Sequence, residues 1–162
     1  MPDPNANPVN GTNIACVEMA DVISRVESTD FIGAIRYEPL VFADHHFNYS
    51  QIANAKDANH CNERTARLIL SCSWGAYQIM GFNLYERTAC DYHGSIADFL
   101  ASKLAQRMAL KKLLDSDHLG YTPAELLDTN KRNHFAEKYN GPGNIADYSA
   151  KLLRALNDLG LK

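Results

Sequence analysis

Residues 73–83 read Ser-Trp-Gly-Ala-Tyr-Gln-Ile-Met-Gly-Phe-Asn, and no other stretch of the chain says as much about the fold. Gly75 has no Cβ, so its backbone can approach a ligand closely. Gln78 offers both a donor and an acceptor for hydrogen bonds, while Trp74 and Tyr77 provide flat apolar faces. The stretch therefore predicts one wall of a binding site. Its Ile79 and Met80 are better explained as core residues, and residues 74–80 are expected to form a short helical segment.

Three further short segments accompany this stretch along the chain. Glu27-Ser28 ends an apolar-periodic region, residues 36–39 read Arg-Tyr-Glu-Pro, and residues 139–143 read Tyr-Asn-Gly-Pro-Gly. Glu27 stands beside Val26 and one helical turn from Ile23. Apolar neighbours of this kind can desolvate a carboxyl group and raise its pKa, which keeps the group protonated and able to donate a proton.

The ordered set of segments resembles the lysozyme-like superfamily, and within it the N-acetylmuramidase domain of phage endolysins. The matching motifs are Glu-Ser, Arg-aromatic-Glu-Pro, Ser-Trp-Gly-x-x-Gln-Ile-Met-Gly-x-Asn and Tyr-Asn-Gly-Pro-Gly, and the resemblance runs from about Ile14 to Leu159. It implies a mainly α (α+β), lysozyme-like fold with a small irregular β-hairpin near the active-site cleft. It also implies a glycosidase that cleaves the β-1,4 bond between N-acetylmuramic acid and N-acetylglucosamine in peptidoglycan.

The resemblance assigns roles to individual residues. It implies that Glu27 is the general acid and that Glu38 is the second catalytic carboxylate. It further implies that the Tyr139 hydroxyl approaches the catalytic carboxyl and that residues 141–143 shape a turn. No metal or organic cofactor is implied. The implied substrate-binding residues are Ser73, Gly75, Tyr77, Gln78, Tyr139 and Asn140.

The class of reaction depends on whether a second carboxylate reaches the sugar. Retaining and inverting glycosidases use two carboxyl groups about 5 to 9.5 Å apart. Asp44 is a reserve candidate for this role, while an ion pair with Arg36 would explain Glu38 structurally. A lytic transglycosylase, the alternative reaction class, needs one Glu as acid and then base, because the 6-hydroxyl of the muramic acid attacks in place of water.

One departure from the family pattern lies beside the acid. The muramidases usually follow Glu-Ser with Gly-Gly, whereas this chain has Thr29-Asp30. The change alters the expected loop and brings a charge close to Glu27. Rate and specificity are more affected by it than the class of reaction.

Three rival interpretations remain. A zinc enzyme would use clustered residues such as His45, His46 and His60, but no His-x-x-x-His spacing is present. A Cys-His hydrolase could use Cys72, although nothing marks this thiol as activated. A cell-wall-binding module without catalysis is the third, and intact Glu27 argues against it.

Composition predicts one domain with a substantial core. The chain has 162 residues, of which 46% are hydrophobic, and a formal net charge of -3. The slightly negative net charge argues against nucleic-acid binding. No apolar stretch reaches the roughly 20 residues of a membrane span. We expect a disordered lead-in over residues 1–12, a single catalytic domain over residues 13–162, and a monomer.

The N-terminal residues do not resemble a signal peptide, so we expect synthesis in the host cytoplasm and action on the wall after holin-type release or injection. The cysteines are expected to be reduced thiols. They are Cys16, Cys61, Cys72 and Cys90.

Apolar periodicity and turn residues predict the elements. Helices are expected over 14–26 with Thr12 or Asn13 as N-cap, over 63–72, over 133–138, and from after Asn144 to before Gly160. Another helix is expected over 96–114, with Ser95 as N-cap and with Ile96, Phe99, Leu100 and Leu104 on one apolar stripe. Residues 31–42 favour a short irregular strand or hairpin, and 48–62 favour a loop or frayed helix. A capping box at residues 122–125 marks a further helix start.

Overall fold

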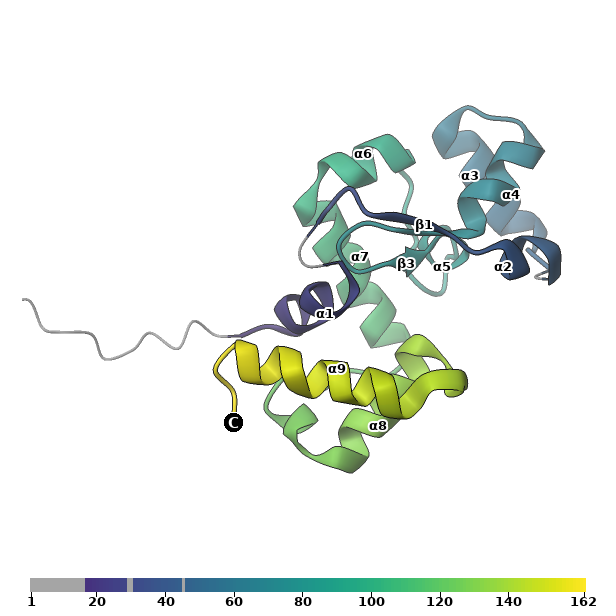
Figure 1. Cartoon of the computed structure of the whole chain (residues 1–162). Helices are drawn as coiled ribbons and strands as arrows, with labels where there is room; N and C mark the ends of the chain where they lie inside the picture. Colours follow the sequence, from purple (N-terminus) through teal and green to yellow (C-terminus); the bar gives the residue numbers. More distant parts are fainter. Residues whose placement is uncertain (1–16, 29–30, 45) are drawn as a thin grey trace, which may run out of the picture.

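The computed structural model describes residues 17–28, 31–44 and 46–162. Within these ranges the fold is mainly α with one small antiparallel sheet, as the sequence predicts (Figure 1). The α-helices are α1 (Met19–Glu27), α2 (Pro39–Asp44), α3 (Tyr49–Asn59), α4 (Glu63–Leu70), α5 (Gly81–Leu84), α6 (Ile96–Ala101), α7 (Lys103–Ser116), α8 (Thr129–Asn140) and α9 (Ile145–Asp158). The strands are β1 (Ile35–Tyr37), β2 (Cys72–Trp74) and β3 (Ile79–Met80), and 3-10 turns span η1 (Glu125–Leu127) and η2 (Pro142–Asn144).

The sheet has the order β1-β2-β3, and both pairs are antiparallel. Arg36 of β1 lies opposite Ser73 of β2, which in turn lies opposite Met80 of β3. The prediction of a helix over residues 74–80 is therefore wrong. Gly75 and Gln78 both adopt positive φ angles, of 74° and 48°, and reverse the chain into a hairpin where a helix would need negative φ.

The prediction for residues 31–42 is correct only for the strand β1. Pro39 begins the helix α2, a position where a fixed φ and a missing N–H are tolerated. The hairpin near the site is thus formed by β2 and β3, not by residues 31–42.

Helix α3 occupies the region for which the sequence favours a loop or a frayed helix. Its first turn is capped twice: the Asn48 side chain accepts from the Gln51 N–H at 2.8 Å, and the Gln51 side chain accepts from the Asn48 N–H at 2.9 Å. This reciprocal arrangement satisfies N–H groups that a helix start leaves open. The buried residues Ile52 and Ala55 then hold the helix on the core.

The helix expected over residues 96–114 is broken. Ser102 has an extended conformation and caps α7 with its hydroxyl, which accepts from the Ala105 N–H at 3.1 Å. The break rotates the following turn, so Leu104 is 69% exposed, although the sequence placed it on the apolar stripe. Ile96 and Phe99 are buried, in agreement with the prediction.

Other predicted elements are confirmed. The helix α4 begins at Glu63, α9 begins after Asn144, and Ser95 caps α6 by accepting from the Asp98 N–H at 3.1 Å. The box at Thr122 and Glu125 forms both of its hydrogen bonds but leads into the 3-10 turn η1. The expected N-cap at residues 12–13, the lead-in over residues 1–12 and Cys16 lie outside the described residues.

One apolar core joins these elements. Its largest fully buried side chains include Tyr77 and Tyr85 near the sheet, Phe99 in α6 and Phe135 in α8. Figure 1 shows α8 and α9 lying together beneath α1, with α3 and α4 at the opposite end of the molecule. No helix in the described part of the chain has the length and apolarity to cross a bilayer.

Candidate active site

Glu27 closes the helix α1, whose apolar residues Val22 and Ile23 are fully buried. Its partly buried carboxylate accepts a hydrogen bond from the Tyr148 hydroxyl, with 2.5 Å between Tyr148 Oη and Glu27 Oε1. Burial raises the pKa of Glu27 above its ordinary value, while the Tyr148 hydrogen bond and the charges of Arg36 and Lys151 lower it. Burial is the largest effect, so the pKa is raised overall.

The tyrosine at the acid is therefore not the one that the sequence indicated. The Tyr139 hydroxyl donates instead to the backbone carbonyl of Tyr77, at 2.8 Å. The Tyr139 ring stacks between Phe135 at 5.4 Å and Tyr148 at 6.3 Å, measured between ring centroids. Tyr148 lies 121 residues from Glu27 along the chain, so the sequence holds no local signal of this contact.

Two hydrogen bonds bring three of the four motifs together. The Ser28 hydroxyl donates to the Ala76 carbonyl at 2.8 Å, and the Tyr139 hydroxyl donates to the neighbouring Tyr77 carbonyl. The turn between β2 and β3 is thus tied to the end of α1 on one side and to α8 on the other. Backbone carbonyls that are held from both sides fix the turn relative to Glu27.

Gln106 of α7, which sequence reasoning missed, holds the same turn from within. Its Oε1 accepts from the Ala76 N–H at 2.8 Å, and its Nε2 donates to the carbonyls of Ile32 at 2.9 Å and Phe99 at 3.0 Å. A Cβ on Gly75 would stand 2.4 Å from Gln106 Oε1. The close approach of the Gln106 amide and the φ of 74° explain why residue 75 is glycine. From the sequence alone, this glycine is explained by contact with a ligand instead.

The remaining predicted binding residues differ in their exposure. Ser73 is fully buried, and among the described residues its Oγ has no hydrogen-bond partner. Tyr77 is 1% exposed and belongs to the core, and Trp74 is also buried, with its Nε1 donating to the Ile69 carbonyl at 2.9 Å. Gln78 is half-buried and donates from Nε2 to the Gly75 carbonyl at 2.9 Å. Asn140 is exposed at the end of α8.

Glu38 forms the ion pair with Arg36 that the sequence left as an alternative explanation. The Glu38 side chain is 30% exposed, and its backbone N–H donates to the Ser71 carbonyl at 3.0 Å. Because Arg36 also lowers the pKa of Glu27, one guanidinium acts on both candidate carboxylates. The side chain of Asp44 and the Thr29-Asp30 pair lie outside the described residues.

The rival chemistries gain no support here. Within residues 17–28, 31–44 and 46–162, no group of three or more His, Cys, Asp or Glu side chains could hold a metal ion. Burial and the nearby Glu38 charge raise the pKa of the Cys72 thiol, which disfavours the thiolate that a cysteine nucleophile needs. Cys61 and Cys90 are free thiols as well.

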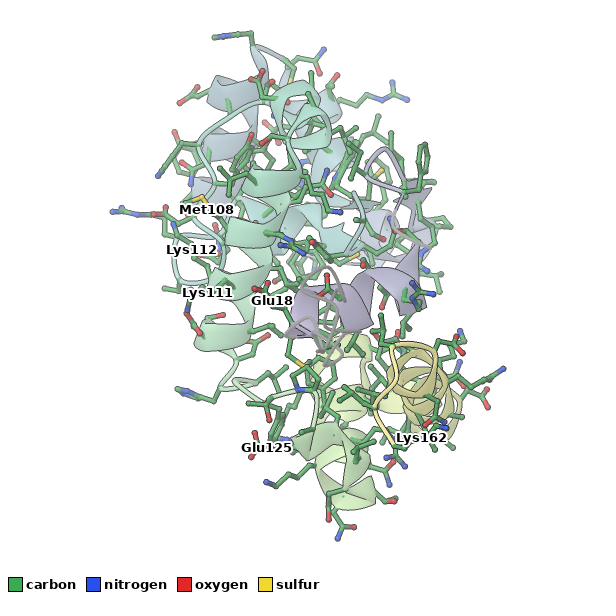
Figure 2. All side chains as sticks on the ribbon, turned by 90° about the vertical axis from the view of Figure 1, so that its left-hand side faces the viewer. Glu18, Met108, Lys111, Lys112, Glu125 and Lys162 are labelled. Atoms are coloured by element: carbon green, nitrogen blue, oxygen red, sulfur yellow. The ribbon has the colours of Figure 1, made fainter. Side chains whose placement is uncertain are left out.

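A separate cavity of about 450 Å³ lies between the first turn of α1 and α7. Glu18, Met108 and Lys111, three of the residues that line it, face the same side of the molecule (Figure 2). None of its lining residues belongs to the motifs, so we assign it no part in the chemistry.

Comparison with known proteins identifies the family of the chain. The family model described as N-acetylmuramidase matches residues 22–160. The endolysin of Enterobacteria phage PRD1 is 38% identical over 148 residues, which cover 88% of this chain and 96% of that protein. No solved structure matches the chain. On these matches, the chain belongs to the N-acetylmuramidase family of peptidoglycan-degrading enzymes.

Proposed function

We propose that this enzyme cleaves the β-1,4 bond between N-acetylmuramic acid and N-acetylglucosamine, with Glu27 as the general acid. The leaving oxygen needs a proton, since an alkoxide leaves poorly near neutral pH. A carboxyl group can supply that proton only while it is protonated, and burial raises the pKa of Glu27. This perturbed carboxyl, held by Tyr148 beside the motif turn, is the observation that carries the proposal.

The binding residues divide into two groups. Gln78 is half-buried and Asn140 is exposed, and both are proposed to contact the glycan through their amide groups. Ser73, Gly75 and Tyr77 are buried, so we propose that they shape the wall of the site and leave sugar contact to others. Tyr139 supports this wall through the Tyr77 carbonyl.

For the second step we propose hydrolysis, with Glu38 or a water that it orients completing the reaction. The ion pair with Arg36 orients the Glu38 carboxylate, which suits a base or a nucleophile. The same ion pair favours the second candidate, a lytic transglycosylase, because a carboxylate engaged by Arg36 is less available to water. In that case Glu27 acts as acid and then as base, and the product ends in 1,6-anhydromuramic acid.

Mass spectrometry of the products from purified peptidoglycan tests both candidates. Reducing muramic ends are expected for the hydrolase, while products lighter by one water identify the transglycosylase. Glu27→Gln should abolish product formation, and Glu137→Gln, an exposed carboxylate on α8, should behave as wild type. Normal activity of Glu27→Gln would exclude Glu27 as the acid.

We further propose that the enzyme works as a monomer and reaches the wall after release from the cytoplasm. Complementation of a lysis-defective phage with and without its holin tests the route. Lysis without the holin would contradict the proposed dependence on release.

A further inference from the structure

A basic hollow of about 250 Å³ lies between α1 and α9, next to the catalytic acid. The first turn of α9 lies at the same end as the last turn of α1, because Tyr148 contacts Glu27. The hollow begins beside the last turn of α1 and follows α9 away from the acid. It is lined by Arg25, Val26, Lys151, Arg154, Ala155 and Asp158.

The three cations of this hollow are not neutralised by ion pairs with any described residue. Asp21, one turn before Arg25 on α1, is engaged by Arg107, with 2.9 Å between the paired atoms. Arg154 donates only to the Ala150 carbonyl of its own helix, at 3.4 Å. Asp158 is the one acidic residue in the lining, so the hollow carries an excess of two positive charges.

This positive excess stands out in a chain whose formal net charge is -3. The hollow also interacts electrostatically with the proposed catalytic acid, because the charge of Lys151 lowers the pKa of Glu27. Arg25 lies two residues before Glu27, and Lys151 lies three residues after Tyr148, on the same face of α9. A ligand bound near Glu27 can therefore extend into the hollow.

We infer that this hollow binds the carboxylates of the peptide stem on the muramic acid residue next to the cleaved bond. The inference rests on the proposed function. The N-acetylated sugars of the glycan are uncharged, whereas the lactyl group of each muramic acid carries a peptide with free carboxylates. Cleavage at a muramic acid brings that peptide close to Glu27, and two guanidinium groups suit carboxylates because each can bind with two N–H groups.

The double variant Arg25→Gln/Arg154→Gln tests the inference on two soluble substrates. One is a muramic acid oligosaccharide with its peptide stems, and the other is the same oligosaccharide after an amidase has removed them. Loss of two exposed charge contacts should raise KM for the stem-bearing substrate about 2- to 30-fold and leave kcat unchanged. KM for the bare glycan should not change, and added salt should weaken the wild type more than the variant.

Two controls make the result specific. Lys103→Gln/Lys112→Gln removes the same charge from α7, where Figure 2 shows Lys112 well away from α9, and should leave both KM values unaltered. Lys151→Gln is measured separately, since its charge also acts on Glu27 and should move the pH profile. Unfolding curves of all variants exclude a loss of structure.

Equal effects on both substrates, or no effect on either, would overturn the inference while leaving the proposed function intact. Loss of binding to phosphate-bearing vesicles or wall polymers, with both KM values unchanged, would assign the hollow to phosphate and also overturn it. If the wild type cleaves neither substrate, the proposed function fails. Equilibrium binding of the two oligosaccharides in the Glu27→Gln background then decides the inference without catalysis.

Discussion

Substitution Tyr148→Phe should make the stability of this enzyme depend more steeply on pH. The change removes only the hydroxyl that donates to Glu27 and keeps the buried ring. A hydrogen bond to an ionised group contributes about 1.5–3 kcal/mol, and one between neutral groups about 0.5–1.5 kcal/mol. We therefore expect the larger loss at a pH where Glu27 is ionised and the smaller one where it is protonated.

The sign follows from the pKa of Glu27. Burial raises this pKa in the folded state, so the folded protein binds the proton more tightly than the unfolded chain. The resulting stability is present at acid pH and is lost as pH rises through the ordinary value of 4.5 and then the folded value. Without the Tyr148 hydrogen bond, which lowers the pKa, the folded value rises further and the loss at neutral pH grows.

Urea unfolding at pH 4 and pH 8 measures the difference, and the pH profile of cleavage adds a second readout. The basic limb of the profile, where the general acid loses its proton, should move to higher pH in Tyr148→Phe. Tyr139→Phe is the matched control, because its hydroxyl donates to the neutral Tyr77 carbonyl and its loss should be the same at both pH values. Equal, pH-independent losses in the two variants, with an unmoved basic limb, would refute this reasoning.

Three other substitutions test the hairpin formed by β2 and β3, and a fourth, at Gly141, serves as a control. Gly75→Ala should lower the free energy of unfolding by about 2–5 kcal/mol in a thermal unfolding assay, because φ is positive and the new Cβ meets Gln106. Gly141→Ala also has a positive φ, but its Cβ meets nothing within 4 Å, so the loss in the same assay should be only about 1–2 kcal/mol. Gln106→Leu leaves the Ala76 N–H unsatisfied and should cost at least about 2 kcal/mol, with a lower kcat in a dye-release assay if the turn shifts. Ser73→Ala should change the free energy of unfolding by less than about 1 kcal/mol, since its buried hydroxyl is unpartnered among the described residues, and a large loss would reveal a missed partner.

Sequence predicted elements whose patterns are local. The apolar spacing of α9 and the N-cap of α6 each lie within a few residues, and both were placed correctly. The prediction for residues 48–62 left a loop and a frayed helix open, although the capping residues Asn48 and Gln51 of α3 are visible in the sequence. Its face is only weakly apolar, and tertiary packing of Ile52 and Ala55 supplies what periodicity does not show.

The turn between β2 and β3 shows why a motif can be recognised correctly while its backbone conformation is predicted wrongly. A helix over residues 74–80 agrees with the side chains, yet Gly75 and Gln78 take positive φ values because β2 and β3 must pair with each other and with β1. The requirement for glycine at position 75 comes from Gln106, whose side-chain amide occupies the space that a Cβ would fill. Gln106 lies 30 residues beyond Ala76, with which it forms a hydrogen bond. Such a partner becomes apparent only when α7 is packed against the sheet.

Tertiary packing also determines which of two tyrosines donates a hydrogen bond to the acid. Tyr139 and Tyr148 lie on either side of the η2 turn, and their rings stack within the α8–α9 hairpin. The packing of that hairpin on α1 decides which hydroxyl reaches Glu27, and no spacing in the sequence fixes it. Because Tyr148 and Lys151 both act on the acid from α9, a partial separation of α9 from α1 would remove a hydrogen bond and a charge together. These two losses raise the pKa of Glu27, whereas exposure of the carboxyl to water lowers it, so the chemistry of the acid depends on how tightly the last helix is packed against the first.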